Sequence, residues 1–176
     1  MANFEPIFEK VMGLEGGYKL HKVSGDRGGW TYAGIARKFH QNWPGWIKID
    51  SSQYDSELTA MVRDFYLKEF WNKIRGNDIN SQSVAFLLYD FAVNAGIQTS
   101  VKIAQRILGT SPDGVVGDRT IDALNAFCQT ETAEQNFILM FSLLKVFRYK
   151  NICASRPANL KFMCGWINRV EKGLSS

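Results

Sequence analysis

A single glutamate, Glu15, stands where its side chain can act as an acid. Upstream of it, apolar residues recur at the spacing of one helix face: Phe4, Ile7, Phe8, Val11 and Met12. Glu15 is the next position of that stripe, so burial and the negative end of the helix dipole both disfavour its ionised form. We therefore expect a raised pKa for Glu15. A carboxyl that stays protonated near neutral pH is what a general acid in sugar hydrolysis requires.

The simpler alternative is that Glu15 opens a surface turn, because two glycines follow it and stop the helix in any case. The next residues favour chemistry instead. Residues 24–29 form a cluster of turn-forming residues that contains Asp26. Residues 30–32 (Trp-Thr-Tyr) then place the Thr31 hydroxyl between two aromatic residues, as in the arm of a short β-hairpin.

These residues together resemble the N-terminal signature of glycoside hydrolase family 108. The matching positions are Glu15-Gly-Gly-Tyr18, Asp26, Gly28-Gly29, Thr31 and Gly34-Ile35. Members of that family are peptidoglycan muramidases, often labelled secretion-activator proteins. The order Glu, Asp, Thr in a helix followed by a hairpin is also similar to the active site of phage-type lysozymes. The prolines that usually surround the family's aspartate are absent here.

The resemblance implies a role for each of the three residues. Glu15 would donate a proton to the leaving oxygen, while Asp26 and Thr31 would position the attacking water. Tyr18 and Trp30, on either side of the glycine-rich turn, are candidates for contacts with the sugar. The expected reaction is hydrolysis of the β-1,4 bond between N-acetylmuramic acid and N-acetylglucosamine.

Two polar residues, Asp90 and Asn94, interrupt a predicted helix over 81–95 that is apolar nearly all round. They lie one turn apart on one face. One interpretation is a satisfied polar pair that caps neighbouring backbone groups. The other is that the pair lines the sugar-binding cleft opposite Glu15. The stretch 90–96 resembles the matching segment of the same family, which favours substrate binding by both residues.

The second half of the chain resembles peptidoglycan-binding modules. A short helix over 101–109 precedes the loop Pro-Asp-Gly-Val-Val-Gly at 112–117, and a second helix starts at Asp118 or Arg119. An ordinary helix hairpin is the alternative. Two further helices are predicted, one over 133–149 and one over 160–172 with Asn159 as its cap.

We therefore expect a mainly α, lysozyme-like helical fold with a small β-hairpin. Residues 1–96 would form the catalytic domain. Residues 97–176 would form a helical, peptidoglycan-binding-like domain packed on the first. A chain of 176 residues is long enough for one domain or for two small ones.

Charge and composition limit the partners. The apolar fraction of 45% is ordinary for a globular protein, and the net charge of +4 suits an anionic partner such as the cell wall. The basic residues are scattered, so the chain lacks the dense patch expected of a nucleic-acid-binding protein. Peptidoglycan is therefore the expected partner, and nucleic acid is not.

No cofactor or metal is expected. Two histidines cannot build the usual zinc hydrolase site by themselves. Three cysteines, Cys128, Cys153 and Cys164, are an odd number without a CxxC pair. They predict free thiols rather than a disulfide framework.

The sequence also bears on location. Charged residues interrupt the N-terminal apolar pattern, so we expect no signal peptide. The most apolar run, 137–146, is too short to cross a bilayer and contains Lys145, which predicts a core helix and no stable membrane insertion. The protein would be synthesised in the cytoplasm and act at the cell wall or periplasm, with a holin or a secretion-system helper as the partner for export.

Two other activities use the same residue types. A lytic transglycosylase also needs one protonated glutamate, but it forms an anhydro sugar instead of admitting water. A non-catalytic wall-binding protein that helps secretion would use the same surface without turnover. The presence of Asp26 and Thr31 together with Glu15 favours hydrolysis over both alternatives.

Overall fold

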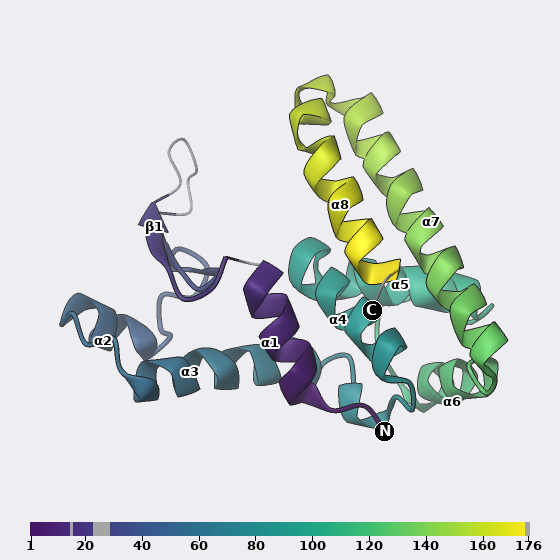
Figure 1. Cartoon of the computed structure of the whole chain (residues 1–176), viewed down its shortest axis with the longest axis horizontal. Coiled ribbons are helices and arrows are strands. Elements are labelled where there is room, and N and C mark those ends of the chain that lie inside the picture. The colour runs from purple at the N-terminus through teal and green to yellow at the C-terminus, as the bar shows by residue number, and fades with distance from the viewer. Residues whose placement is uncertain (15, 23–28, 175–176) are drawn as a thin grey trace. The chain divides into compact units, whose positions relative to one another are not determined.

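The computed structural model describes residues 1–14, 16–22 and 29–174. The fold is mainly α-helical with one small antiparallel sheet, as predicted for a lysozyme-like protein (Figure 1). The chain divides into two compact units. The N-terminal unit is Phe4–Glu69, and the helical unit is Met1–Asn3 together with Phe70–Ser176.

The N-terminal unit combines three helices with a three-stranded sheet among its described residues. Its elements are α1 (Phe4–Leu14), β1 (Leu20–Lys22), β2 (Trp30–Tyr32), β3 (Ile35–Ala36), α2 (Gly45–Asp50) and α3 (Ser56–Tyr66). The strands are antiparallel in the order β1-β2-β3, so the predicted hairpin is present and gains a third strand.

The predicted apolar stripe of α1 is confirmed, because all five of its members are buried: Phe4, Ile7, Phe8, Val11 and Met12. Two backbone hydrogen bonds close the C-terminal end of the helix. The N–H of Gly16 donates to the carbonyl of Gly13 (3.4 Å), and that of Gly17 donates to the carbonyl of Met12 (2.9 Å). Both Gly16 and Gly17 have positive φ (87° and 75°), which explains why glycine ends this helix.

A tight turn at Ala33-Gly34 joins β2 to β3. Both residues have positive φ, 47° and 80°, the signature of the type I′ turn that suits the twist of a hairpin. The Tyr66 hydroxyl donates to the Ala33 carbonyl (2.9 Å) and lies where a side chain at Gly34 would have to go. Glycine is therefore required at position 34 for space as well as for backbone conformation.

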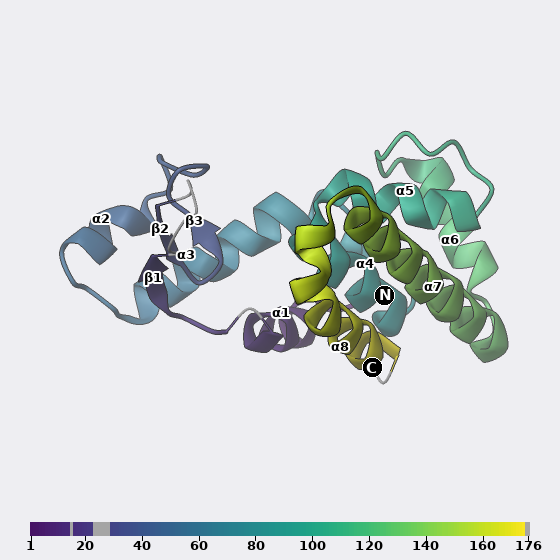
Figure 2. The same ribbon diagram turned by 90° about the horizontal axis from the view of Figure 1, so that it is seen from above.

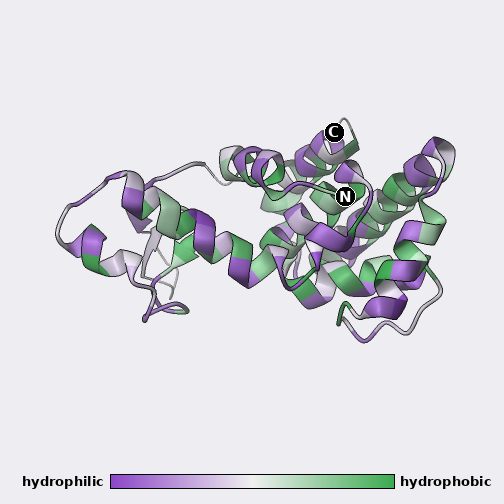
Figure 3. Cartoon of the chain, turned by 90° about the horizontal axis from the view of Figure 1, so that it is seen from below, coloured by the Kyte–Doolittle hydropathy of each residue, from purple (hydrophilic) through white to green (hydrophobic). Residues whose placement is uncertain are grey.

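The helical unit is built around α4. Its helices are α4 (Gln82–Ala95), α5 (Ile97–Ile107), α6 (Asp118–Phe127), α7 (Glu131–Ser155) and α8 (Met163–Leu174). Residues 84–92 of α4 are buried without a break, which explains why this helix is apolar nearly all round. Helices α7 and α8 lie side by side (Figures 1 and 2). The other helices of this unit contain both hydrophobic and hydrophilic residues, as expected for helices with one buried side (Figure 3).

The expected domain boundary after residue 96 falls between α4 and α5. In the structure α4 packs against α5 and α7 within the helical unit. The compact units thus change at Phe70 rather than at the end of α4. The assignment of 1–96 and 97–176 to different tasks stays a prediction.

The start of the last helix was predicted wrongly. Asn159 does not cap it but lies within a 3-10 helix, Pro157–Phe162, and α8 begins only at Met163. None of the residues of this 3-10 helix is buried, so the segment lacks the buried apolar stripe by which a helix can be located in the sequence. Proline at its first position also fits a new helical segment here. No described helix combines the length and apolar character needed to cross a bilayer.

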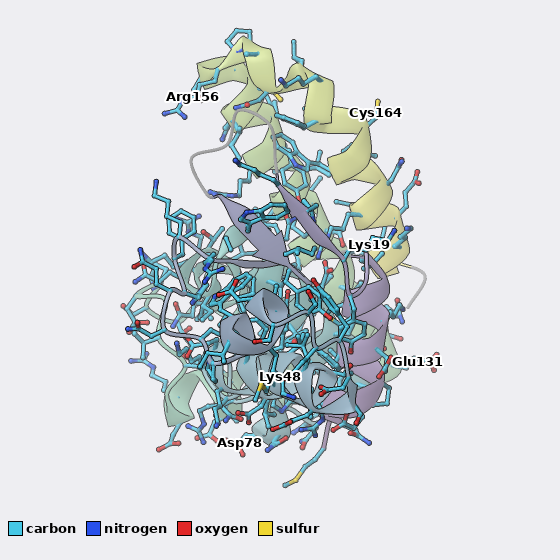
Figure 4. All side chains as sticks on the ribbon, turned by 90° about the vertical axis from the view of Figure 1, so that its left-hand side faces the viewer. Lys19, Lys48, Asp78, Glu131, Arg156 and Cys164 are labelled. Atoms are coloured by element: carbon cyan, nitrogen blue, oxygen red, sulfur yellow. The ribbon has the colours of Figure 1, made fainter. Side chains whose placement is uncertain are left out.

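The three cysteines are free thiols in different environments. Cys153 is buried, Cys128 is half-buried, and Cys164 is exposed on α8 (Figure 4). Burial raises the pKa of the Cys128 thiol from its usual value near 9 to about 11. Since the thiolate is the reactive form, Cys128 should be inert at neutral pH.

This environment predicts selective labelling. At pH 8, Cys164 should react readily with a maleimide or disulfide reagent, whereas Cys128 should react about 100-fold more slowly than an unhindered thiol of ordinary pKa. The rate at Cys128 should keep rising with pH until about 11, as the thiolate fraction grows. Timed labelling followed by peptide mass analysis measures both rates. Equal labelling of the two residues at pH 8 would contradict the assigned environments.

Candidate functional site

Two of the three expected catalytic residues, Glu15 and Asp26, lie outside the described residues. In the sequence, Glu15 directly follows the last residue of α1, and Asp26 falls between β1 and β2. The structure therefore describes the elements on both sides of each residue. Their roles as acid and as water-positioning group stay predictions.

Thr31 is the middle residue of the central strand β2. It is half-buried and lies opposite His21 of β1 and Ala36 of β3. A residue paired on both sides is held more firmly than one on an edge strand, so the sheet fixes the position of the Thr31 backbone. A hydroxyl at such a site can orient a water molecule with little freedom of its own.

Tyr18 and Trp30 of the N-terminal unit are the expected sugar contacts. Their exposed fractions, 38% and 46%, leave part of each aromatic side chain accessible to solvent. Tyr18 lies just before β1, while Trp30 starts β2 opposite Lys22. Partial burial of the ring raises the pKa of Tyr18, so its hydroxyl stays protonated and can donate a hydrogen bond. An aromatic ring with a polar end suits a ligand that presents both C–H faces and hydroxyls.

Asp90 and Asn94 lie in different environments. Asp90 is 1% exposed, and its Oδ1 accepts a hydrogen bond from Nε of Arg169 (2.9 Å). Its Oδ2 lies 3.7 Å from Nζ of Lys145. Asn94, one turn later on α4, is exposed. The ion pairs fit the structural interpretation of Asp90, and substrate contact by either residue stays a prediction.

A pocket in the N-terminal unit was not anticipated from the sequence. It has a volume of about 470 Å³ and lies between the loop after β3 and the helix α3. Phe39 is 72% exposed at its rim, and the His40 ring packs edge-on against Phe65 at 4.7 Å. The lining residues are Phe39, His40, Gln41, Asn42, Trp43, Pro44, Met61, Asp64, Phe65, Lys68 and Glu69. The run of aromatic and amide residues at 39–43 was the signal available in the sequence.

The loop at 112–117 in the helical unit is organised by one buried amide. Nε2 of Gln105 donates to Oδ1 of Asp113 (2.8 Å) and to the carbonyl of Val115 (3.0 Å). Its Oε1 accepts from the N–H of Gly114 (2.9 Å), where φ is +84°. A backbone hydrogen bond from Val115, followed by that from Gln105, lowers the pKa of Asp113. The loop is thus fixed from within and presents Val115, 67% exposed, to solvent.

Within residues 1–14, 16–22 and 29–174, no group of three or more His, Cys, Asp or Glu side chains is arranged to hold a metal ion. The candidate chemistry described above rests on carboxyl, hydroxyl and aromatic groups.

Comparison with known proteins divides the chain in two. Residues 8–96 match the family model of glycosyl hydrolase 108, and residues 99–171 match a predicted peptidoglycan domain. The structure is similar to that of SagA from Brucella abortus, with a TM-score of 0.74 and 25% sequence identity. That similarity covers 98% of this chain and 91% of SagA. No curated protein matches the sequence.

Proposed function

Because the chain belongs to the glycosyl hydrolase 108 family, we propose that it is a lysozyme-type N-acetylmuramidase. Its target would be the β-1,4 bond between N-acetylmuramic acid and N-acetylglucosamine of peptidoglycan. The observation that carries the proposal is the pairing of two matches in one chain. A glycoside hydrolase match at 8–96 is followed by a match to a peptidoglycan domain at 99–171. Such a chain is a glycoside hydrolase that acts at the cell wall.

The proposed mechanism assigns one task to each of three residues. Glu15, directly after α1, protonates the glycosidic oxygen as the bond breaks. Asp26 and the Thr31 hydroxyl hold the attacking water on the opposite face of the sugar. The central place of Thr31 in the sheet supports this assignment, since a water-positioning group must itself be held still. The proposed mechanism needs no cofactor.

Further residues would contact the substrate. The exposed rings of Tyr18 and Trp30 are suited to stack on sugar faces, and the exposed amide of Asn94 can bind an N-acetyl group. The family resemblance implies a contact from Asp90 too, but its burial and its ion pairs with Lys145 and Arg169 favour a structural role instead. The aromatic pocket at 39–44 lies in the same unit as Thr31 and is a further place for a saccharide to bind.

The rest of the chain would hold the enzyme on its substrate. In this proposal residues 1–96 carry the chemistry and residues 97–176 grip the wall through the loop at 112–117 and its neighbouring helices. A holin or a secretion-system helper would bring the protein from the cytoplasm to the wall or periplasm.

Digestion of purified sacculi tests the reaction. A muramidase releases fragments with reducing N-acetylmuramic acid ends, which mass analysis after borohydride reduction detects. A lytic transglycosylase would leave anhydromuramic ends instead, and a non-catalytic secretion helper would bind sacculi without releasing fragments. Either result would overturn the proposed reaction.

The stereochemistry of the product is a separate prediction. An inverting glycosidase keeps its two carboxyl groups about 6.5–9.5 Å apart to admit water, against about 5–5.5 Å in a retaining one. With water held by Asp26 and Thr31 opposite Glu15, the first product should carry the α configuration at the new muramic acid end. Proton NMR during early turnover measures this. Asp26→Asn should slow turnover strongly, yet less than a change at Glu15, because water can still attack the activated sugar. A β-configured first product would exclude the water-positioning role.

A further inference from the structure

A groove between α5 and α7 of the helical unit has no role in the mechanism proposed above. Its volume is about 570 Å³, within the range of about 300–1,000 Å³ typical of pockets that bind small ligands. Its lining residues are Gln98, Thr99, Lys102, Ile103, Arg106, Leu144, Phe147, Arg148, Asn151, Ile152 and Ser155. Because both helices belong to one compact unit and pack against each other, the groove is a feature of that unit alone.

Three positive charges line the groove. Lys102 and Arg106 lie one turn apart on α5, and Arg148 faces the groove from α7. In the part of the chain that the structure describes, none of the three forms an ion pair with a carboxylate. Lys102 has a weak electrostatic interaction with Asp113, the smallest of the causes that lower the pKa of that carboxyl. A concave surface with three unneutralised cations attracts an anionic ligand.

The groove also has an apolar side. Ile103 is 5% exposed, and Leu144 and Ile152 are half-buried on the facing helix. Phe147 is 49% exposed at the edge. Amide and hydroxyl groups of Gln98 and Asn151 complete the lining. The occupant that fits is therefore small, anionic and partly aliphatic, with amide groups to hydrogen-bond.

We propose that this groove binds the stem peptide of peptidoglycan. That peptide is short, consists largely of alanine and acidic residues, and carries free carboxylates with small aliphatic side chains. Its carboxylates would pair with Lys102, Arg106 and Arg148, while its methyl groups would lie against Ile103 and Leu144. A glycan strand fits less well, because it carries fewer carboxylates than the stem peptide for the three cations, and Phe147 is the one aromatic ring of this lining.

The choice of ligand rests on the proposed function, because the stem peptide is part of peptidoglycan. Binding in the groove does not depend on the proposed catalytic mechanism. Catalysis is assigned to residues of the first 96 positions, whereas the groove lies wholly within 98–155. Binding of the peptide would hold the enzyme on cross-linked wall and leave the glycosidic bond free for the catalytic residues. It would also make the enzyme prefer peptide-bearing strands to bare glycan.

Binding measurements on the full chain test the proposal. Calorimetry or NMR titration would compare the free stem tetrapeptide with the same peptide after its carboxylates are amidated. The tetrapeptide should bind, and amidation should weaken binding by at least about tenfold, because the charge-assisted hydrogen bonds are lost. The combined variant Lys102→Gln, Arg106→Gln, Arg148→Gln should weaken tetrapeptide binding to a similar degree. It should leave binding of the amidated peptide nearly unchanged.

A matched control removes three exposed cations of the same unit that do not line the groove. The substitutions are Lys150→Gln, Lys161→Gln and Lys172→Gln. Net charge falls equally, so an equal loss of affinity in both variants would show a general charge effect and overturn the proposal. Absence of tetrapeptide binding to the wild type would overturn it as well.

The outcome separates the groove from the reaction. If the wild type cuts sacculi to reducing muramic ends and the groove variant binds the tetrapeptide like wild type, the groove proposal fails and the reaction stands. If sacculi are not cut but the tetrapeptide binds through the three cations, the reaction fails and the groove proposal stands.

Discussion

The Glu15→Gln variant should lose lytic activity by about 10²–10⁴-fold or more while it keeps its fold. The proposed leaving group is a sugar oxygen that departs poorly unless it is protonated, so loss of the acid slows bond cleavage itself. Glutamine has nearly the same shape as glutamate and carries no charge. The substitution therefore removes the proton and little else.

Stability and a matched variant separate chemistry from structure. The melting temperature of Glu15→Gln should equal or exceed that of the wild type, because the charged form of Glu15 is expected to be unfavourable at the end of α1. Glu57→Gln is the control, because Glu57 is an exposed glutamate of the same unit. Its ion-pair partner Lys48 would still be paired with Asp55 in this variant. Control activity should match the wild type. A folded Glu15→Gln protein with near-normal lysis would exclude Glu15 as the acid.

Local sequence patterns were sufficient to predict much of the fold. The stripe of α1 is buried as expected, because helical periodicity alone decides which side of a helix meets the core. Asp55 caps α3 by accepting from the N–H of Leu58, and Ser81 caps α4 in the same way through Val84. These interactions span three residues and can be inferred from short segments of sequence.

Contacts between distant residues could not be predicted in this way. Asp90 was singled out as a polar interruption, but its partner Arg169 lies 79 positions away. Lys145 was noticed only as a charge within an apolar run. The groove between α5 and α7 likewise depends on how two helices pack, and its three cations are scattered in the sequence. A sequence without a structure shows the type of each residue but not which charges share a site.

The ion cluster around Asp90 gives the largest expected change in stability. Asp90 is 1% exposed, and Nη2 of Arg169 lies 2.8 Å from its Oδ1. The Lys145 side chain is fully buried, and its ammonium group also lies 5.0 Å from the centre of the Phe91 ring. Burial lowers the pKa of Lys145, because it disfavours the charged ammonium, and the attraction of Asp90 opposes this effect in part. Asp90 is thus the counter-charge for two cations.

Replacing Asp90 by asparagine should destabilise the fold by about 3–5 kcal/mol, because it leaves buried cations uncompensated. Adding Lys145→Met should restore a large part of that loss, since methionine fills similar volume without charge. Urea unfolding of the wild type, both single variants and the double variant measures the coupling between the two residues. Independent, additive losses would contradict the cluster. A fold of wild-type stability with weakened saccharide binding would instead assign Asp90 to the substrate.

The pH dependence of the same variants provides an independent test of Lys145. Its lowered pKa means that the native state releases the Lys145 proton at lower pH than the unfolded chain, whose lysines titrate near 10.4. Between those two values the unfolded state binds more protons, so the free energy of unfolding rises with pH through this residue. Comparing wild type with Lys145→Met from pH 7 to 10 isolates this contribution, because the variant lacks the titrating group. The wild type should gain stability relative to the variant as pH rises. If the difference in free energy of unfolding between the two proteins stays constant over this range, the pKa of Lys145 is not lowered in the folded state. The argument that Lys145 needs Asp90 as a counter-charge would then fail.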